Sequence, residues 1–396
     1  MIETHPTTRL LGVDTGGTFT DLVLLDGNTV RTYKLPSTPD DPSRAVLEGV
    51  RHLLGEERGL VFHGSTVATN ALLEGKGAKV ALVTTAGFGD LLRIGRQNRP
   101  QLYALQPENR ATLVPAEWVV EVQERILADG TVELGLNEAE IERVVATIQA
   151  TGCESVALCL LHAYANPVHE QQLQAALEKR GCRVSASHRV LPEYREFERA
   201  STTAVNAAVS PVMTRYLERL QSGLQERSLR IMQSNGGAIL AATAGSEAVR
   251  TILSGPAGGM VGAFAAARAA GCERIITFDM GGTSTDVGLC DASIPMTSET
   301  VIAGWPVKVP MIDIHTVGAG GGSIARIDAG GALRVGPESA GADPGPVCYG
   351  KGLAVTVTDA NLYLGRLRAD RFLGGRMALA VDRCHRAVEE LAAVAG

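Results

Sequence analysis

Hydrophobic residues change their spacing along the chain, and these changes predict a succession of strands and helices. Three apolar runs at 9–13, 19–25 and 30–35 are separated by short turns containing glycine, a pattern typical of antiparallel strands. A helical spacing follows as far as residue 54. Short apolar runs then alternate with helical stretches up to residue 186, which predicts layered strands and helices, an α/β fold.

The longest helical pattern covers residues 197–227 and contains a proline. Because proline lacks an N–H and clashes with the preceding turn, we expect Pro211 to kink this helix or to split it in two. We place the crossing between two halves here, which divides the chain into 1–199 and 200–396 and leaves the second half incomplete. Further along, residues 308–314 are predicted to form a strand.

One pattern of thirteen residues occurs twice. Residues 14–26 read DTGGTFTDLVLLD and residues 279–291 read DMGGTSTDVGLCD, with the same residue at eight positions. Such a match indicates an internal duplication, so we expect two related halves that face one cleft. In both copies a second strand follows the glycines at once, which predicts a hairpin and separates the motif from a Walker A loop.

The repeated turn combines residue types that suit a bound triphosphate. A strand delivers an aspartate, two glycines permit close approach of the backbone, and a threonine hydroxyl can donate to phosphate oxygens. We therefore predict that Asp14 and Asp279 bind Mg²⁺ and align a transferring phosphoryl group. The candidate phosphate-binding residues are Gly16, Gly17, Thr18, Thr20, Gly281, Gly282, Thr283 and Thr285. An ordinary glycine-rich hairpin, with the later Thr and Asp side chains bonded locally, is the alternative.

Three other places hold candidate site residues. Asp313 and His315 would share one side of the predicted strand, where the histidine is suited to proton transfer or to burial in the core. His63, Thr66 and Asn70 surround a predicted helix start at Val67, and they either contact substrate or form a capping network. A polar segment at 87–110 carries Arg93, Arg96, Arg99 and Arg110. Arg96 is the candidate for binding a substrate carboxylate or phosphate, and a solvated loop is the alternative.

Composition excludes several classes of protein. The net charge is −6 and no long basic run occurs, so nothing indicates binding to nucleic acid or to an anionic membrane. The first residues lack a basic and apolar signal sequence, and no apolar run is long enough to span a bilayer. The seven cysteines are scattered without a C-x-x-C pair, which predicts free thiols in a reducing, cytoplasmic setting.

The paired D-x-G-G-T turns resemble the phosphate-1 and phosphate-2 loops of the actin, sugar-kinase and heat-shock-chaperone ATPase superfamily. More narrowly, the chain resembles the A subunit of the hydantoinase/oxoprolinase family. The matching stretches include GVDTGGTFTD (12–21), HGSTVATNALLE (63–74), SGPAGG (254–259), HTVGAGGGS (315–323) and GADPGPVCYG (341–350). The resemblance implies a duplicated actin-like (ribonuclease-H-like) fold around a nucleotide cleft, with ATP and Mg²⁺ as cofactors.

The resemblance also implies an activity, namely ATP-driven opening of a small cyclic amide such as 5-oxoproline or hydantoin. It further implies a B-type hydantoinase subunit as partner and a homo-oligomer. Two alternatives stay open: an ATP-dependent ketone carboxylase subunit of the acetone or acetophenone type, and a catalytically inert fragment. Family A subunits carry a string near FGGAGP that seats adenosine, and no such string occurs here. We therefore expect a member that is truncated at its C-terminus.

Overall fold

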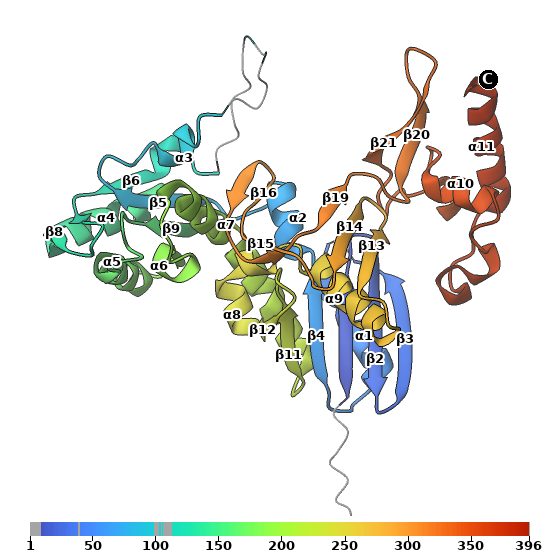
Figure 1. Cartoon of the computed structure of the whole chain (residues 1–396), viewed down its shortest axis with the longest axis horizontal. Coiled ribbons are helices and arrows are strands. Elements are labelled where there is room, and N and C mark those ends of the chain that lie inside the picture. The colour runs from blue at the N-terminus through green and yellow to red at the C-terminus, as the bar shows by residue number, and fades with distance from the viewer. Residues whose placement is uncertain (1–8, 39, 99–102, 104, 106–112, 396) are drawn as a thin grey trace, which may run out of the picture.

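A six-stranded sheet forms the centre of the computed structural model, which describes residues 9–38, 40–98, 103, 105 and 113–395 (Figure 1). The strand order is β12-β11-β4-β1-β2-β3. The bounds are β1 (Leu10–Thr15), β2 (Phe19–Asp26), β3 (Thr29–Pro36), β4 (Leu60–Ser65), β11 (Ser228–Met232) and β12 (Ala238–Leu240). β1, β2 and β3 are antiparallel neighbours, as their turns predict, whereas β4 runs parallel to β1.

One face of this sheet is covered by helices. α1 (Pro42–Leu54) begins with a proline at its first turn, and the Asp41 side chain accepts a hydrogen bond from Ser43 N. Its apolar side joins the sheet and α7 (Glu196–Leu224) in one hydrophobic core. The short helices α2 (Val67–Leu73) and α8 (Ala241–Ser246) contact α7 as well.

A second, four-stranded sheet is entirely parallel, in the order β10-β9-β5-β6. Its strands are β5 (Val80–Thr85), β6 (Val119–Val122), β9 (Ser155–Cys159) and β10 (Val184–Ala186). The helices and small strands around it are α3 (Leu91–Ile94), β7 (Arg125–Ile126), β8 (Val132–Leu134), α4 (Glu138–Thr151), α5 (Val168–Lys179) and α6 (Ser187–Val190). Figure 1 shows this unit to one side of the central sheet.

α7 joins the two sheets, and it is one continuous helix. Its first half packs Ala200 and Ala204 against the parallel sheet, and its second half packs Met213 and Leu220 against the central sheet. The predicted split at Pro211 is wrong, since a single helix of 29 residues runs through the proline, and a kink at that position stays a prediction. Packing along both halves outweighs the one backbone hydrogen bond that the proline removes.

A third sheet carries the second copy of the repeat, in the order β13-β14-β19. It consists of β13 (Arg274–Met280), β14 (Thr285–Asp291) and β19 (His315–Val317), and α9 (Ser254–Ala269) packs against it. The strand predicted at 308–314 is too long, since only the two residues of β18 (Met311–Ile312) are in a strand, paired with β15 (Met296–Thr297). A neighbouring pair is formed by β16 (Thr300–Ile302) and β17 (Trp305–Val307).

The last part of the described chain forms a hairpin and two helices at the edge of the molecule (Figure 1). These are β20 (Ser323–Ile327), β21 (Leu333–Ser339), α10 (Val357–Tyr363) and α11 (Val381–Ala395). The expected boundary between 199 and 200 falls inside α7, and β11 pairs with β4 and β12, so the strands at 228–240 belong to the same central sheet as the first hairpin. We propose a division after β12 instead. No helix in the described ranges is both long and apolar enough to cross a membrane.

Candidate functional site

The two copies of the repeated turn have the same local structure and meet at their tips. Gly16 N donates to Phe19 O at 3.0 Å, and Gly281 N donates to Ser284 O at 2.9 Å, at equivalent positions of the repeat. The two turns are also in contact, because a Cβ placed on Gly282 would lie only 2.8 Å from Thr18 Oγ1. The duplication therefore brings both hairpins to one place, as expected.

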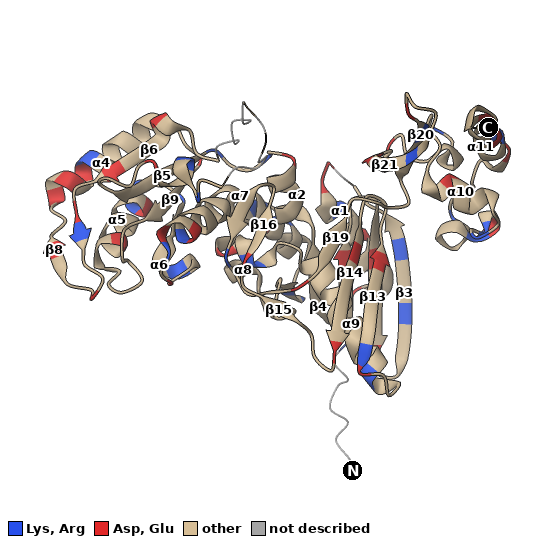
Figure 2. Ribbon diagram, turned by 45° about the horizontal axis from the view of Figure 1, so that its top comes forward, with Lys and Arg blue, Asp and Glu red and all other residues tan. Residues whose placement is uncertain are grey.

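Four carboxylates gather at the ends of these strands. Asp14 lies opposite Asp21 in one hairpin and Asp279 lies opposite Asp286 in the other, so the two members of each pair share a face of their sheet. Figure 2 shows the acidic bands on β13 and β14. Within the described chain, the side-chain carboxylates of Asp14 and Asp279 have no hydrogen-bond or ion-pair partner. Two of the four carboxylates are therefore available to a ligand.

The electrostatics of Asp14 reflect this crowding. Asp14 is exposed on one side, but nearby protein atoms partly desolvate its carboxylate. The pKa of Asp14 is raised from 3.8 to about 6, mainly by this desolvation and then by the charges of Asp21 and Asp279, while the charge of Lys34 lowers it. Desolvation also raises the pKa of Asp286, to which Asp279 adds while the hydroxyl of Thr316 opposes the rise. A cation bound beside Asp14 and Asp286 would favour the ionised form of both carboxylates.

Two glycines make room for the Asp14 side chain. A Cβ on Gly64 would lie 3.2 Å from Asp14 Oδ1, and a Cβ on Gly255 would lie 2.9 Å from the same atom. Gly64 sits beside Asp14 in the register of β4 with β1, and Gly255 is in the first turn of α9. Sequence reasoning did not assign either glycine to the Asp14 site. The signal available was a glycine near the end of a predicted strand (Gly64) and another at the start of a predicted helix (Gly255), which does not reveal what either glycine approaches.

The predicted phosphate-binding residues separate into two groups. Thr20 and Thr285 are buried and bonded within the protein: Thr20 shares a 3.0 Å hydrogen bond with the hydroxyl of Ser37, and Thr285 Oγ1 donates to Ala319 O. By contrast, the hydroxyls of Thr18 and Thr283 have no hydrogen-bond partner in the described ranges. The remaining candidates, Gly16, Gly17, Gly281 and Gly282, form the turns themselves. Thr18 and Thr283 thus remain available for phosphate oxygens.

The glycine run after β19 supports the second hairpin. Gly321 N donates to Gly281 O at 2.9 Å, and Gly322 N donates to Gly282 O at 2.7 Å. A Cβ on Gly320 would lie 2.7 Å from the carbonyl carbon of Gly282. Gly320 and Gly322 therefore have to be glycine, because the backbone of Gly282 lies where a Cβ would point.

His63, Thr66 and Asn70 form an internal network. The His63 ring is buried, with Nδ1 3.3 Å from Val13 O and Nε2 2.7 Å from the hydroxyl of Tyr216. Burial lowers the pKa of His63 to about 4, so the ring is neutral at pH 7. Thr66 Oγ1 donates to Thr15 O at 3.0 Å and Asn70 Nδ2 donates to Thr66 Oγ1 at 3.4 Å. These contacts attach α2 to the first hairpin.

The structure does not bring His315 to the two aspartates. His315 lies opposite Val287, which lies opposite Phe278, so its side chain shares their face of the sheet. Asp279 is the next residue along β13 and points to the other face. Asp313 is exposed and lies between strands β18 and β19, with its N–H donating to Pro295 O at 3.0 Å. The two residues therefore do not form a pair on one strand.

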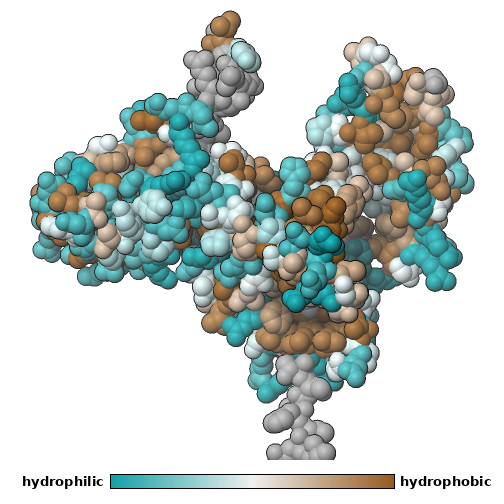
Figure 3. Space-filling view, viewed as in Figure 1, coloured by the Kyte–Doolittle hydropathy of each residue, from teal (hydrophilic) through white to brown (hydrophobic). Residues whose placement is uncertain are grey.

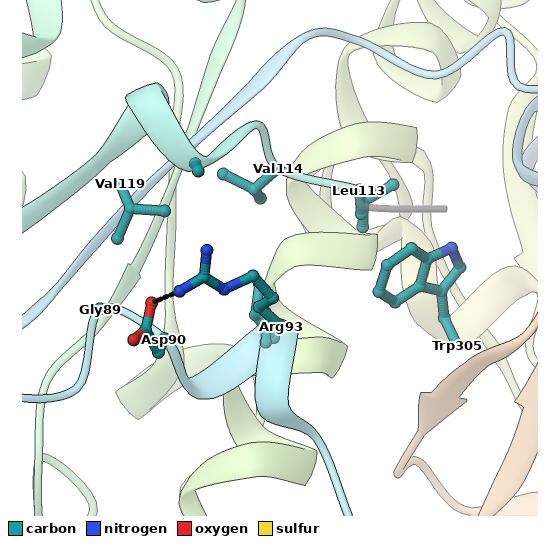
Figure 4. Close-up of a pocket in the computed structure, with 9 residues that line it drawn as sticks. Gly89, Asp90, Arg93, Leu113, Val114, Val119 and Trp305 are labelled. Carbon is teal, nitrogen blue, oxygen red and sulfur yellow. Dashed lines mark hydrogen bonds and ion pairs between the residues drawn. The ribbon is translucent and has the colours of Figure 1, made fainter. Parts of the chain in front are cut away.

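Arg96 is held by carboxylates of two distant segments. Its Nε donates to Glu198 Oε1 at 2.6 Å and its Nη2 lies 3.2 Å from Glu299 Oε2. Nearby, a small cavity of about 60 Å³ is lined by Leu113, Val119 and Trp305, with Arg93 paired to Asp90 at 2.7 Å (Figure 4). Such a volume holds a few waters rather than a cyclic amide. Arg99 and Arg110 lie outside the described residues.

Lys34 is a residue that sequence reasoning overlooked. Its ammonium group lies 2.6 Å from Asp21 Oδ2 and lowers the pKa of Asp14 through its charge. In the second copy, the equivalent pair is Asp286 with Thr316, so only the first hairpin carries a cation. The signal was a lysine at the end of the third apolar run, which the strand register places beside the aspartate.

The residues at the hairpins fit a hydrated magnesium ion. Among the described residues no group of three or more His, Cys, Asp or Glu side chains forms a ready-made metal site. Mg²⁺, however, keeps several waters and is commonly bound by one or two carboxylates together with substrate phosphates. The free carboxylates of Asp14 and Asp279, together with the glycine-lined space around Asp14, meet that requirement.

Comparison with known proteins agrees with the geometry. The chain is 40% identical to the caprolactamase subunit alpha of Pseudomonas jessenii over 93% of its own length and 56% of that protein. It is 38% identical to 5-oxoprolinase 1 of Arabidopsis thaliana over 91% of its length and 31% of that protein. A solved structure of acetone carboxylase matches 96% of the chain and 58% of its own, at a TM-score of 0.82 and 28% identity.

The chain therefore spans between 31% and 58% of the length of these three relatives. The structural match, together with the two related hairpin sheets, confirms the duplicated actin-like α/β fold predicted from the sequence. Residues 10–181 match the family model for the hydantoinase/oxoprolinase N-terminal region, and residues 199–396 match the hydantoinase/oxoprolinase model. The chain belongs to the hydantoinase/oxoprolinase family.

Proposed function

We propose that this chain is the nucleotide-binding part of an enzyme that opens a small cyclic amide at the expense of ATP. The observation that carries the proposal is the meeting of two equivalent hairpins, each presenting a free carboxylate, at Asp14 and Asp279. The relatives supply the class of substrate, since they are a caprolactamase subunit and a 5-oxoprolinase.

The chemistry explains why ATP is consumed. Amide resonance makes a lactam carbonyl a poor target for water at neutral pH. Transfer of the γ-phosphoryl group forms a bond from the amide oxygen to phosphorus and breaks the bond to ADP. Water then adds to the activated carbon, and the C–N bond of the ring breaks as a proton moves to the nitrogen, which leaves an acyl phosphate. A second water hydrolyses the acyl phosphate to the carboxylate and inorganic phosphate. Mg²⁺, when bound, neutralises charge on the phosphates.

The residues of this chain hold and orient the triphosphate. Asp14 and Asp279 would bind the hydrated Mg²⁺ from two sides. The hydroxyls of Thr18 and Thr283 would donate to phosphate oxygens, together with backbone N–H groups of the turns. Among those groups, the N–H of Gly16 and that of Gly281 already close the turns, which leaves the following residues of each turn for the ligand.

The other predicted site residues have a supporting role in this proposal and do not contact the ligand. The buried, neutral His63 supports the first hairpin from behind, and Thr66 fixes the Thr15 carbonyl at the base of the turn. Arg96 bridges two segments through Glu198 and Glu299. We therefore do not assign a substrate contact to them in this arrangement.

A partner is part of the proposal. One relative is named as the alpha subunit of its enzyme, so it acts in an assembly. We propose that a B-type subunit supplies the water-attack step for this chain and that the assembly contains several copies of each.

The test measures phosphate release from Mg²⁺–ATP by the assembled enzyme that contains this chain. 5-Oxoproline, hydantoin and caprolactam are supplied in turn, and Asp14→Asn and Asp279→Asn serve as variants. We expect release that depends on a cyclic amide and falls at least about 100-fold in either variant, as loss of electrostatic stabilisation does. Amide-dependent release at the wild-type rate in both variants would contradict the assignment of the hairpins.

A ketone carboxylase is the second candidate, because of the structural match to acetone carboxylase. The same assay separates the two when acetone or acetophenone plus bicarbonate replaces the amide. Phosphate release with the ketone and bicarbonate, but with no cyclic amide, would establish the carboxylase and exclude the amidase.

A further inference from the structure

A buried arginine in the unit of the parallel sheet has two nitrogen donors without an acceptor among the described residues. Arg199 lies near the start of α7 and has an exposed fraction of 0%. Its Nη1 donates to Ser187 Oγ at 2.7 Å, whereas Nε and Nη2 have no hydrogen-bond partner in the described chain. Buried polar groups are almost always paired, and a buried charge without an acceptor is costly. The acceptor for this side of Arg199 therefore has to come from a ligand or from water.

The contacts that Arg199 does make hold its guanidinium in one orientation. Ser187 Oγ accepts from Arg199 and donates in turn to Glu170 Oε1 at 2.6 Å. Glu170 is bonded through its other oxygen to the ring and the N–H of His188. The Cζ of Arg199 lies over the Tyr164 ring, 5.5 Å from its centroid. Nε and Nη2 form one edge of the planar group, so the edge that stays free is one that matches the two oxygens of a carboxylate.

Arg199 borders a hollow at the carboxyl ends of two neighbouring parallel strands. The other residues that line it are Thr84, Phe88, Leu91, Cys159, Leu161 and Glu196. Ser187 is not one of them, so Arg199 meets the hollow on the side away from its Ser187 bond.

The strand order makes this hollow a favourable place for a ligand. Thr84 in β5 lies opposite Cys159 in β9. The chain leaves β5 towards β6 on one side and leaves β9 towards β10 on the other side. The connecting helices α3 and α5 pack on opposite faces of the sheet. In open α/β sheets, ligands bind outside the carboxyl ends of two strands whose connections diverge in this way.

The walls and charges of the hollow define the chemistry of the ligand. The side chains of Phe88, Leu91 and Leu161 make it apolar, although the surface of this unit is mainly hydrophilic on the face seen in Figure 3. Burial raises the pKa of Cys159 to about 11 while Arg199 opposes the rise, so the thiol is neutral at pH 7 and does not neutralise the guanidinium. One cation beside the half-buried carboxylate of Glu196 suits a monoanion and disfavours a phosphate dianion.

The hollow is closed in this structure, because its walls are too close together to admit a water molecule. One wall belongs to residues 87–95, which we call the cover, and it carries Phe88 and Leu91. The cover begins at Gly87 and ends at Gly95, with φ angles of 88° and 54° that favour glycine. It is a short exposed segment between these two glycines, so a ligand gains access when the cover moves outward.

We propose that Arg199 binds the carboxylate of a small organic acid at this point of the parallel sheet. The Nε–H and Nη2–H groups donate to the two carboxylate oxygens, and the apolar body of the acid packs against the cover and Leu161. The proposal involves no residue of the two hairpins and does not rest on the proposed activity.

The test uses the full 396-residue chain with three probes, namely butyrate, its neutral analogue butyramide and inorganic phosphate. Calorimetry measures affinity, and the NMR resonance of the Arg199 Nε–H group, assigned through its own backbone, reports on the site. Arg199→Lys keeps the charge but lacks the planar edge. Arg189→Lys, at an exposed arginine of α6, is the matched control, and Glu196→Gln removes the competing carboxylate.

We expect butyrate to shift the Arg199 Nε–H resonance and to bind at least about 10-fold more tightly than butyramide or phosphate. Arg199→Lys should weaken butyrate binding at least about 10-fold, Arg189→Lys should leave it unchanged, and Glu196→Gln should tighten it. The resonance and Glu196→Gln decide the question even where Arg199→Lys does not fold.

Three results would overturn the proposal. Absence of butyrate binding would show that water alone serves the free edge. Butyrate binding that leaves the Arg199 resonance in place would put the ligand elsewhere. Equal affinities for butyrate and butyramide would show that the site takes a neutral acceptor and not a carboxylate.

Discussion

Replacing Asp14 by asparagine should stabilise the protein and weaken triphosphate binding at the same time. The carboxylate has a pKa of about 6 because it is desolvated and close to Asp21 and Asp279. At pH 8 it is ionised in surroundings that favour the neutral form. Asparagine keeps the shape and removes the charge, so the folded state loses an unfavourable interaction.

The size and the sign of this stability change follow from the linkage between proton binding at Asp14 and folding. The folded pKa of about 6 lies above the model value of 3.8, so the folded state binds protons more tightly than the unfolded state. The penalty of the ionised group is absent below pH 3.8, grows as the pH rises through 6, and is complete above it. The full shift corresponds to about 3 kcal/mol, and contact of the carboxylate with solvent reduces this to about 1 kcal/mol.

The assay is urea denaturation of wild type and Asp14→Asn at pH 5 and at pH 8. We expect Asp14→Asn to be more stable by about 1 kcal/mol at pH 8, with a smaller difference at pH 5. Calorimetry with Mg²⁺–triphosphate should show an affinity at least about 10-fold lower in the variant, since one cation ligand is lost. Glu133→Gln, an exposed carboxylate in β8, is the control for general charge effects.

Two outcomes would refute this reasoning. If Asp14→Asn has the same stability as wild type at pH 8, the carboxylates do not repel one another as the geometry requires. If the variant is more stable but binds Mg²⁺–triphosphate as well as wild type, Asp14 is a strained group without a role in the phosphate site.

Three further predictions use matched positions in the chain. Gly255→Ala should lower the affinity for Mg²⁺–triphosphate, because its Cβ would lie 2.9 Å from Asp14 Oδ1, whereas Gly259→Ala in the same helix meets no atom within 4 Å and should bind normally in calorimetry. Gly320→Ala should cost about 1–3 kcal/mol in urea denaturation because it presses on the backbone of the second hairpin, and Gly318→Ala, which meets nothing, should have no such cost. His63→Leu should cost about 1–3 kcal/mol by leaving the buried Tyr216 hydroxyl without its 2.7 Å partner. Its pH profile of activity between pH 6 and 8 should match that of wild type, because the ring does not titrate there.

Local patterns predicted the parts of the fold that are themselves local. Alternating apolar residues predicted the three strands of the first hairpin region, and the helix expected to start at Val67 starts there in the structure. The repeat predicted that Asp14 and Asp279 come together. Two related halves that face one cleft each place the turn at the end of their strand in that cleft. These features depend on residues close in sequence or on a direct internal match.

Features that depend on distant partners were not predictable in this way. Pro211 is tolerated because α7 is packed against two different sheets, which no window of the sequence reveals. His63 lies near the end of an apolar strand and shortly before a helix, a position where many folds place catalytic residues. The register of β4 with β1 instead directs the His63 ring toward Tyr216 and away from Asp14. Gly255 is 241 positions from Asp14, and their contact follows only from the placement of α9.

The two hairpins have equivalent turns but unequal support. The first hairpin is backed by α1 and α7 and is held from the side by Ser37. The second is held by the backbone of residues 320–322, while the side chains behind Asp279 face solvent. Phosphoryl transfer depends on groups that are fixed within fractions of an ångström, and such groups need rigid support. The position of the second hairpin in the phosphate site therefore depends more on its backbone hydrogen bonds with residues 321 and 322 than on side-chain packing behind it.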